Sequence, residues 1–110
     1  MPKKPANTIL LNTDTEHMLI GAVRYALGRR TYIVGTTVSY MTPLLPRLSD
    51  WCLGIMERDL SDAFAMYERT HGEYGLGDAC DVHDWQKFSA ALHAEINGRT
   101  DFDAGRRQNG

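Results

Sequence analysis

The stretch Thr31-Tyr32-Ile33-Val34-Gly35-Thr36-Thr37-Val38-Ser39-Tyr40 decides the fold class, because it fits a strand and a helix almost equally well. Its β-branched and aromatic residues favour a strand. As a helix, the same stretch aligns Val34, Val38 and Met41 on one face. The chain contains no second convincing strand, and a lone strand leaves its backbone hydrogen bonds unmade. We therefore predict a helix over residues 32–42 and an all-α fold.

The residues before this stretch predict a first helix over 14–27. Apolar side chains recur there every three or four positions, which is the spacing of one helix face. Thr13 and Glu16 stand three residues apart, as in a capping box, where each side chain binds the other's free backbone N–H. Gly28 suits the left-handed conformation that commonly follows the end of a helix.

Two further helices are predicted over 50–69 and 82–97. Ser49 is a suitable N-cap for the first, and Gly98 ends the second. The four helices together predict a compact four-helix domain with one core. The predicted core residues are Leu19, Val23, Leu27, Val34, Val38, Leu53, Met56, Leu60, Phe64, Trp85, Phe88 and Leu92.

A chain of 110 residues is expected to form one domain. We place this helical domain at residues 13–98. Residues 1–12 are expected to form a flexible arm, whose apolar run Thr8–Leu11 is compatible with a short extended segment lying on the core. Residues 99–110 are polar and poor in aromatic side chains, so they are expected to be a disordered tail.

The composition is that of a soluble globular protein, with 43% hydrophobic and 24% charged residues. No apolar run reaches the 18 residues of a membrane span, and we expect no membrane association. The two cysteines, Cys52 and Cys80, are too few for a disulfide framework and lie beside apolar residues. They are expected to be buried free thiols in the reducing cytoplasm.

The charges are unevenly distributed along the chain. The net charge is −2, which argues against a generally basic nucleic-acid-binding protein. Residues 1–49 nevertheless carry six basic and two acidic side chains, whereas residues 50–84 carry nine acidic and two basic ones. This asymmetry can produce two oppositely charged faces, unless folding interleaves the two segments.

No catalytic or metal-binding signature stands out. Cys80 and His83 have the C-x-x-H spacing, with His71 and Asp78 nearby, but a structural zinc site needs four nitrogen or sulfur ligands. The glycine-rich loop 71–78 has acidic neighbours, which would repel a phosphate group. The sequence therefore predicts a non-enzymatic protein with no metal and no cofactor.

Two sets of charged residues are candidate contacts for a partner. Arginines and tyrosines gather around the turn between the first two helices, where they suit nucleic acid or an acidic protein surface. Arginines at a helix end also commonly cap carbonyls or pair with acids. The acidic segment suits a basic groove in another protein, and a solvated helix face is the simpler interpretation. The candidate contact residues are Arg24, Arg29, Arg30, Tyr32, Arg47, Glu57, Asp59, Asp62 and Asp78.

The run Arg24-Tyr25-Ala26-Leu27-Gly28-Arg29-Arg30-Thr31-Tyr32-Ile33-Val34, with Cys80-Asp81-x-x-Asp84-Trp85 further on, resembles a family of small, mostly uncharacterised proteins. Bacteriophages and other mobile elements encode this family, and the resemblance covers most of residues 14–96. It implies a helical domain of phage or prophage origin, and supplies no activity or catalytic residue. Small phage proteins often bind host machinery stoichiometrically, anti-CRISPR inhibitors among them.

These expectations combine into one functional hypothesis and one alternative. The hypothesis is a phage or mobile-element accessory protein that binds a host protein complex in the host cytoplasm, as a counter-defence inhibitor of a defence nuclease does. The alternative is a small nucleic-acid-binding regulator that uses the arginine-rich corner. Residues 32–42 contain no Arg, Lys, Asn or Gln to contact base edges, which argues against sequence-specific readout. We expect a monomer or a small homo-oligomer.

Overall fold

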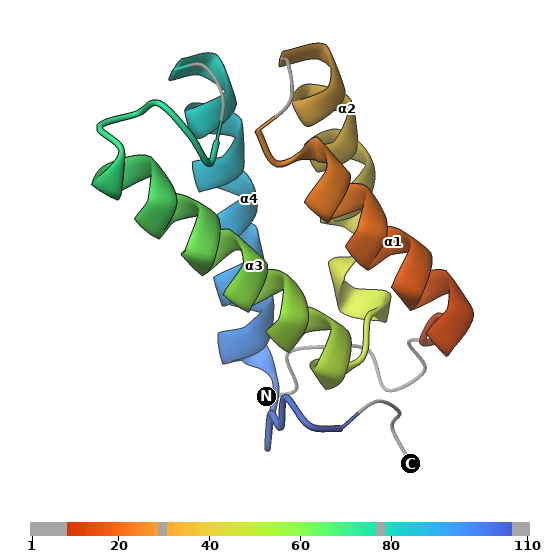
Figure 1. Cartoon of the computed structure of the whole chain (residues 1–110). Helices are drawn as coiled ribbons and strands as arrows, with labels where there is room; N and C mark the ends of the chain where they lie inside the picture. The colour runs from red at the N-terminus through yellow and green to blue at the C-terminus, as the bar shows by residue number, and fades with distance from the viewer. Residues whose placement is uncertain (1–8, 29–30, 77–78, 107–110) are drawn as a thin grey trace.

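The chain forms four α-helices and one 3-10 helix (Figure 1). The computed structural model describes residues 9–28, 31–76 and 79–106, with only the backbone for 31, 32, 79 and 80. No strand occurs in these ranges, and the all-α prediction is confirmed. The elements are α1 (Thr13–Ala26), α2 (Thr31–Met41), η1 (Thr42–Arg47), α3 (Asp50–Arg69) and α4 (Ala79–Gly98).

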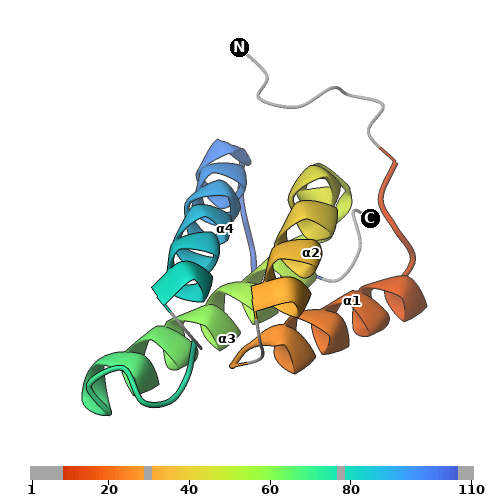
Figure 2. The ribbon, with the colours of Figure 1, turned by 90° about the horizontal axis from the view of Figure 1, so that it is seen from above.

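The helices are arranged in two layers. Helices α1 and α3 form the front layer in Figure 1, and α2 and α4 lie behind them; Figure 2 shows the same layers from above. Helix α2 packs against α1 and α4, and α3 packs against α1 and α4. Each helix therefore buries one face toward a common core between the layers.

The ambiguous stretch is a helix, as predicted. In α2, Val34 is fully buried and Met41 almost fully, whereas Val38 is partly buried against the core. The β-branched residues lower the intrinsic helix propensity by a few tenths of a kcal/mol each. Burial of an apolar face is worth more than that, about 1.5–3 kcal/mol for each fully buried side chain, so packing determines the conformation.

The remaining predicted bounds are close to those observed. Helices α1 and α2 each begin one residue earlier than predicted, α3 matches, and α4 begins at Ala79, three residues early. The segment after α2 forms η1, which the sequence did not predict as a helix. Pro43 stands at its start, where the missing backbone N–H carries no cost.

Eight of the twelve predicted core residues are buried, and the other four, Leu19, Leu27, Val38 and Phe64, are partly buried against the core. The predicted core list omitted several buried residues. Leu76, in the loop before α4, is completely buried, which folds that loop back onto the domain. The other buried hydrophobic residues outside the predicted core list are Ile20, Ala26, Met41, Leu45, Leu48 and Cys52. The burial of Cys52 as a free thiol confirms the separate prediction for that residue.

The predicted capping box is wrong. Asn12 is the N-cap of α1, and its side-chain oxygen accepts a hydrogen bond from the N–H of Thr15 at 2.8 Å. Glu16 instead turns away from its own helix and is 0% exposed. Its carboxylate accepts hydrogen bonds from the N–H of Ser49 at 2.6 Å and from the Ser49 hydroxyl at 2.8 Å. The first turn of α1 is thereby joined to the start of α3.

Ser49 caps α3, as predicted. Its hydroxyl oxygen accepts a hydrogen bond from the N–H of Cys52 at 3.2 Å while its proton goes to Glu16. Such a chain of polar groups is stable in a protein interior only when each member has its partners, as it does here.

The segment 99–106 differs from the disordered tail that the sequence predicts. Figure 1 shows it passing below the start of α3. Asp50, only 6% exposed, accepts hydrogen bonds from Arg99 at 2.8 Å and Arg106 at 2.9 Å, and from the Asp103 N–H at 3.1 Å. The N–H of Trp51 donates to the Arg106 carbonyl at 2.8 Å. We call this docked segment the C-terminal strap; residues 107–110 lie outside the described residues.

Gly54 permits this docking. A Cβ at position 54 would stand 2.7 Å from the Cβ of Ala104, closer than two carbon atoms can approach without a shift. The glycine that weakens α3 as an isolated helix therefore provides the space for the strap.

At the other end of the chain, residues 9–12 lie beside the end of η1. The N–H of Leu11 donates to the Arg47 carbonyl at 2.9 Å, and the Arg47 side chain donates to the Ile9 carbonyl at 3.1 Å. Leu11 packs on the core, whereas Ile9 is exposed. The preceding residues of the predicted arm, 1–8, lie outside the described part of the chain.

Candidate protein-binding surface

Two residues from the oppositely charged candidate sets pair with each other. The Nε atom of Arg24, in the last turn of α1, lies 2.7 Å from Asp59 Oδ2 on α3, and Nη2 lies 3.4 Å from Oδ1. The hydrogen bond and charge of Asp59 raise the pKa of Arg24. The two side chains therefore neutralise each other across the α1–α3 contact.

The structure does not bring Arg47 to Arg24. Arg47 binds the carbonyl of Ile9, beside the start of α1, whereas Arg24 lies in its last turn. Helix α1 has 14 residues and is about 21 Å long, at about 1.5 Å per residue. Arg29, Arg30 and Asp78 lie outside the described residues, and only the backbone of Tyr32 is described.

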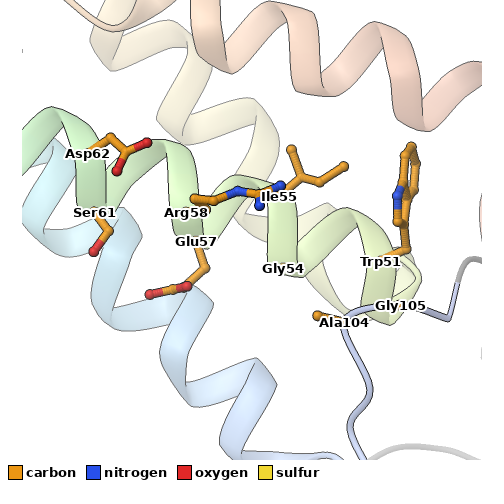
Figure 3. Close-up of a pocket in the computed structure, with 9 residues that line it drawn as sticks. All are labelled: Trp51, Gly54, Ile55, Glu57, Arg58, Ser61, Asp62, Ala104 and Gly105. Carbon is orange, nitrogen blue, oxygen red and sulfur yellow. The ribbon is translucent and has the colours of Figure 1, made fainter.

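The other two acidic candidates, Glu57 and Asp62, line a hollow of about 560 Å³ on α3 (Figure 3). Four of the lining residues, Trp51, Ile55, Arg58 and Asp62, recur at spacings of four, three and four and follow one side of the helix. The strap supplies another wall. The complete lining consists of Trp51, Gly54, Ile55, Glu57, Arg58, Ser61, Asp62, Ala104 and Gly105. We call this site the α3 hollow.

Trp51 is held in place at the end of the hollow. Its indole lies edge-on to the ring of His17 on α1, with 5.1 Å between the ring centroids. Its backbone N–H binds the strap at Arg106. Figure 3 shows the indole at one end of the row formed by Ile55 and Arg58. The apolar part of the hollow is thus preformed by contacts that the chain makes with itself.

The wall formed by the strap depends on Asp50. Burial on its own would raise the pKa of this carboxyl, but hydrogen bonds from Arg99, the Asp103 N–H and Arg106 outweigh burial and hold the pKa below its ordinary value. Asp50 is therefore an anion at neutral pH, and it holds both arginines in place.

Three charged side chains, Glu57, Arg58 and Asp62, border the open side of the hollow. Arg58 and Asp62 are exposed, and within the described ranges neither forms an ion pair. Glu57 points from α3 toward α4 in Figure 3, and its Oε2 atom lies 3.5 Å from His93 Nε2. Two carboxylates and one guanidinium thus surround an apolar floor.

The Glu57–His93 contact extends to Ser89, which gives a serine, a histidine and a carboxylate in a row. The Ser89 hydroxyl oxygen lies 3.4 Å from His93 Nδ1. This is longer than the 2.6–3.2 Å typical of a nucleophile and its base, a distance that is often looser in unliganded proteins. The nearby backbone N–H groups belong to helix interiors, where helical hydrogen bonds occupy them. The helix backbone around this row therefore offers no free N–H groups to stabilise an oxyanion.

Cys52 is unsuited to nucleophilic chemistry. It is completely buried, and burial together with the nearby negative charge of Glu16 raises its pKa to about 12. The thiol therefore stays protonated at neutral pH. In the described part of the chain, no three His, Cys, Asp or Glu side chains gather closely enough to hold a metal ion.

Sequence reasoning identified Glu57 and Asp62 but missed the rest of the α3 hollow. The row Trp51, Ile55 and Arg58 was readable as a second stripe on α3, beside the stripe that forms the core. No local sequence pattern marks Ala104 and Gly105 as lining residues, because only the fold brings the strap to α3.

None of the helices in the described residues is long and apolar enough to span a membrane. The chain matches no protein-family model, no curated protein and no solved structure.

Proposed function

We propose that this chain is a non-enzymatic accessory protein that binds a protein partner through the α3 hollow. The observation that carries the proposal is the combination of Trp51, Ile55 and Arg58 in one preformed hollow. Tryptophan and arginine are enriched among the residues that contribute most to protein–protein binding. A rim of charged side chains around an apolar centre is the common anatomy of such interfaces.

The charges of the hollow indicate the chemistry of the partner. Glu57 and Asp62 outnumber Arg58, so the matching surface carries Lys or Arg side chains around an apolar or aromatic contact. A basic surface of this kind is also what a nuclease presents to nucleic acid. We therefore propose a nucleic-acid-binding host protein, such as a defence nuclease, as the partner.

The proposed setting is the one that the resemblance to small phage and mobile-element proteins implies. A small chain of this kind can act simply by occupying a surface that its target needs. The proposal is thus a counter-defence, anti-CRISPR-like inhibitor that acts in the host cytoplasm.

The nucleic-acid-binding alternative gains little support from the described arginines. Arg24 is paired with Asp59, and Arg47 binds a backbone carbonyl 38 residues away in the chain. A nucleic-acid-binding regulator would need these arginine side chains to bind phosphate groups.

Affinity capture from host lysate tests the proposal. The tagged chain is compared with an Arg58→Glu/Asp62→Lys variant, because both side chains are exposed and the change leaves the net charge unaltered. The matched control is Glu68→Lys/Arg69→Glu, which reverses the same two charge types at exposed positions near the other end of α3. Lysates are treated with nuclease before capture.

We expect a protein that survives nuclease treatment to be retained by the native chain and by the control, and to be lost with the hollow variant. Recovery of nucleic acid alone, or of proteins that nuclease removes, would favour the regulator. A partner retained equally by all three chains would place the contact elsewhere.

A further inference from the structure

The C-terminal strap has a firmly held start at Arg99. The Arg99 guanidinium binds Asp50 at 2.8 Å and Glu95 at 2.9 Å. It also donates to the Leu45 carbonyl at 3.1 Å, and its side chain is only 9% exposed. None of these acceptors belongs to the strap. The start of the strap is therefore anchored whether or not the residues after it are docked.

The rest of the strap, residues 101–106, is held more weakly. Phe102 is its hydrophobic side chain that packs against the core, and it is only partly buried. Segments with few buried apolar contacts are the ones that open locally while the remainder of a domain stays folded. The exposed residues of this part are Asp101, Asp103, Ala104 and Gly105.

Two features of the docked strap oppose its docking. Asp101 has a φ angle of +56°, a left-handed conformation that is unfavourable for a residue with a Cβ atom. The Nε atom of Arg106 is buried and has no hydrogen-bond partner among the described residues. A buried donor without an acceptor is costly. Both costs disappear when the strap leaves α3.

Undocking does not leave Asp50 without a partner. The strap gives this carboxylate the Arg106 guanidinium at 2.9 Å and the Asp103 N–H at 3.1 Å. Both contacts are lost when residues 101–106 move away, but the bond from Arg99 remains. A buried carboxylate that keeps a guanidinium partner avoids the main penalty of an uncompensated charge. Asp50 can therefore be accommodated in both states.

We propose that residues 101–106 form a hinged wall of the α3 hollow, which moves away from α3 as a unit while the four helices stay folded. The hinge lies at Thr100 and Asp101, just after the anchored arginine. Ala104 and Gly105 line the hollow beside α3 (Figure 3), so movement of the wall opens the hollow on that side.

The wall regulates the hollow. The complete lining exists only with the wall closed, so a partner that fits the hollow stabilises the closed state. This step rests on the function proposed above, whereas the movement of the wall does not.

Hydrogen exchange of the full chain tests the movement. Exchange is followed for single residues by NMR, without a partner, from zero to about 1 M urea. The probes are the N–H groups of Trp51 and Asp103, whose acceptors lie across the contact between the strap and α3. The reference is the N–H of Met56, a buried residue in the interior of α3.

After correction for intrinsic rates, the N–H groups of Trp51 and Asp103 should exchange at least about tenfold faster than that of Met56. The two should share one opening free energy and depend little on urea, because undocking exposes little surface. Exchange at the rate of Met56, with the same urea dependence, would overturn the proposal, since the strap would then open only when the domain unfolds. Two different opening free energies would overturn the movement as a unit.

Arg106→Gln loosens the wall without altering a residue that lines the hollow. Loss of a charged hydrogen bond should speed exchange at the Trp51 N–H about tenfold, with an unchanged helical circular dichroism spectrum. The matched control, Arg69→Gln, removes the same charge at an exposed position of α3 and should leave exchange unchanged. Equal exchange rates in both variants would contradict the role of Arg106 in holding the wall.

The same exchange measurement tests the link to binding, with the protein that the native chain retains from host lysate as the probe. At a free concentration about ten times its dissociation constant, this protein should slow exchange at the Trp51 N–H about tenfold, because it binds only the closed state. No slowing by a protein whose binding Arg58→Glu/Asp62→Lys abolishes would overturn the link and leave the proposed function standing. If no protein is retained, the proposed function fails, and exchange of the chain alone still decides whether the wall moves.

Discussion

The carboxylate of Glu16 accepts hydrogen bonds from both the N–H and the hydroxyl of Ser49, in the interior between α1 and α3. Ser49 in turn caps α3 through the Cys52 N–H. The side chain that the sequence assigns to capping its own helix thus supports the start of another. Its contribution comes from satisfying buried donors, which are costly to leave unpaired.

We expect Glu16→Ala to lower the free energy of unfolding by about 3 kcal/mol, because it leaves the Ser49 N–H buried without its acceptor. Chemical denaturation followed by circular dichroism measures the loss. Asp14→Ala is the matched control, since it removes an exposed acid from the same turn. It should cost about 0.5 kcal/mol through the helix dipole. Equal losses for the two variants would contradict the account of Glu16.

The difference between predicted and observed capping has a physical explanation. Thr13 and Glu16 satisfy the local pattern of a capping box. Asn12, the residue before the helix, is also a preferred N-cap, and a helix needs only one N-cap residue. Glu16 is drawn away from its own helix by Ser49, which is 33 residues away from it in the sequence. No local pattern contains that information.

At the scale of elements, the helices themselves were largely predictable. The apolar stripes and the Ser49 and Gly28 signals located α1 and α3 to within one residue. Gly28 has the left-handed φ of +83° that its position predicts. For α2, the β-branched residues favour a strand, but the sequence offers no partner strand, and this second argument gave the correct prediction of a helix. The strap could not be predicted, because its polar sequence gives no sign of the arginine pairs with Asp50.

Gly54→Ala should release the strap. The added Cβ would stand 2.7 Å from Ala104 Cβ, so the strap must shift away from α3. We expect faster hydrogen exchange at the Trp51 N–H, which donates to the Arg106 carbonyl. The double variant Gly54→Ala/Ala104→Gly should restore the protection by removing the clash. Unchanged exchange in the single variant would contradict the docked position of the strap.

Asp50 makes the strap sensitive to acid. Because hydrogen bonds and the charge of Arg99 outweigh burial and hold its folded-state pKa below the ordinary value of 3.8, its stabilising effect is present above that value. The effect is lost as the pH falls through the folded-state pKa. Asp50→Asn should therefore lower stability by about 3 kcal/mol at pH 7, because Arg99 loses a buried anionic partner.

The difference between the native chain and Asp50→Asn should shrink as the pH falls below 3.8. Urea denaturation at a series of pH values measures it. A difference that stays constant from neutral pH into this acid range would show that the charge of Asp50 does not hold the strap.

At the scale of the whole molecule, the α3 hollow combines an indole, an arginine and two acids on one side of the domain. In the described part of the chain, the basic and acidic segments meet at one point, where Arg24 and Asp59 pair across the α1–α3 contact. Composition alone could not predict this pairing.

The central claim is that the α3 hollow binds a basic protein partner, and calorimetric titration of the captured partner tests it most directly. We predict one partner site for each chain. The dissociation constant should rise about tenfold or more for Arg58→Glu/Asp62→Lys and stay unchanged for Glu68→Lys/Arg69→Glu. Equal affinity of the hollow variant and the native chain, with both correctly folded, would contradict the account.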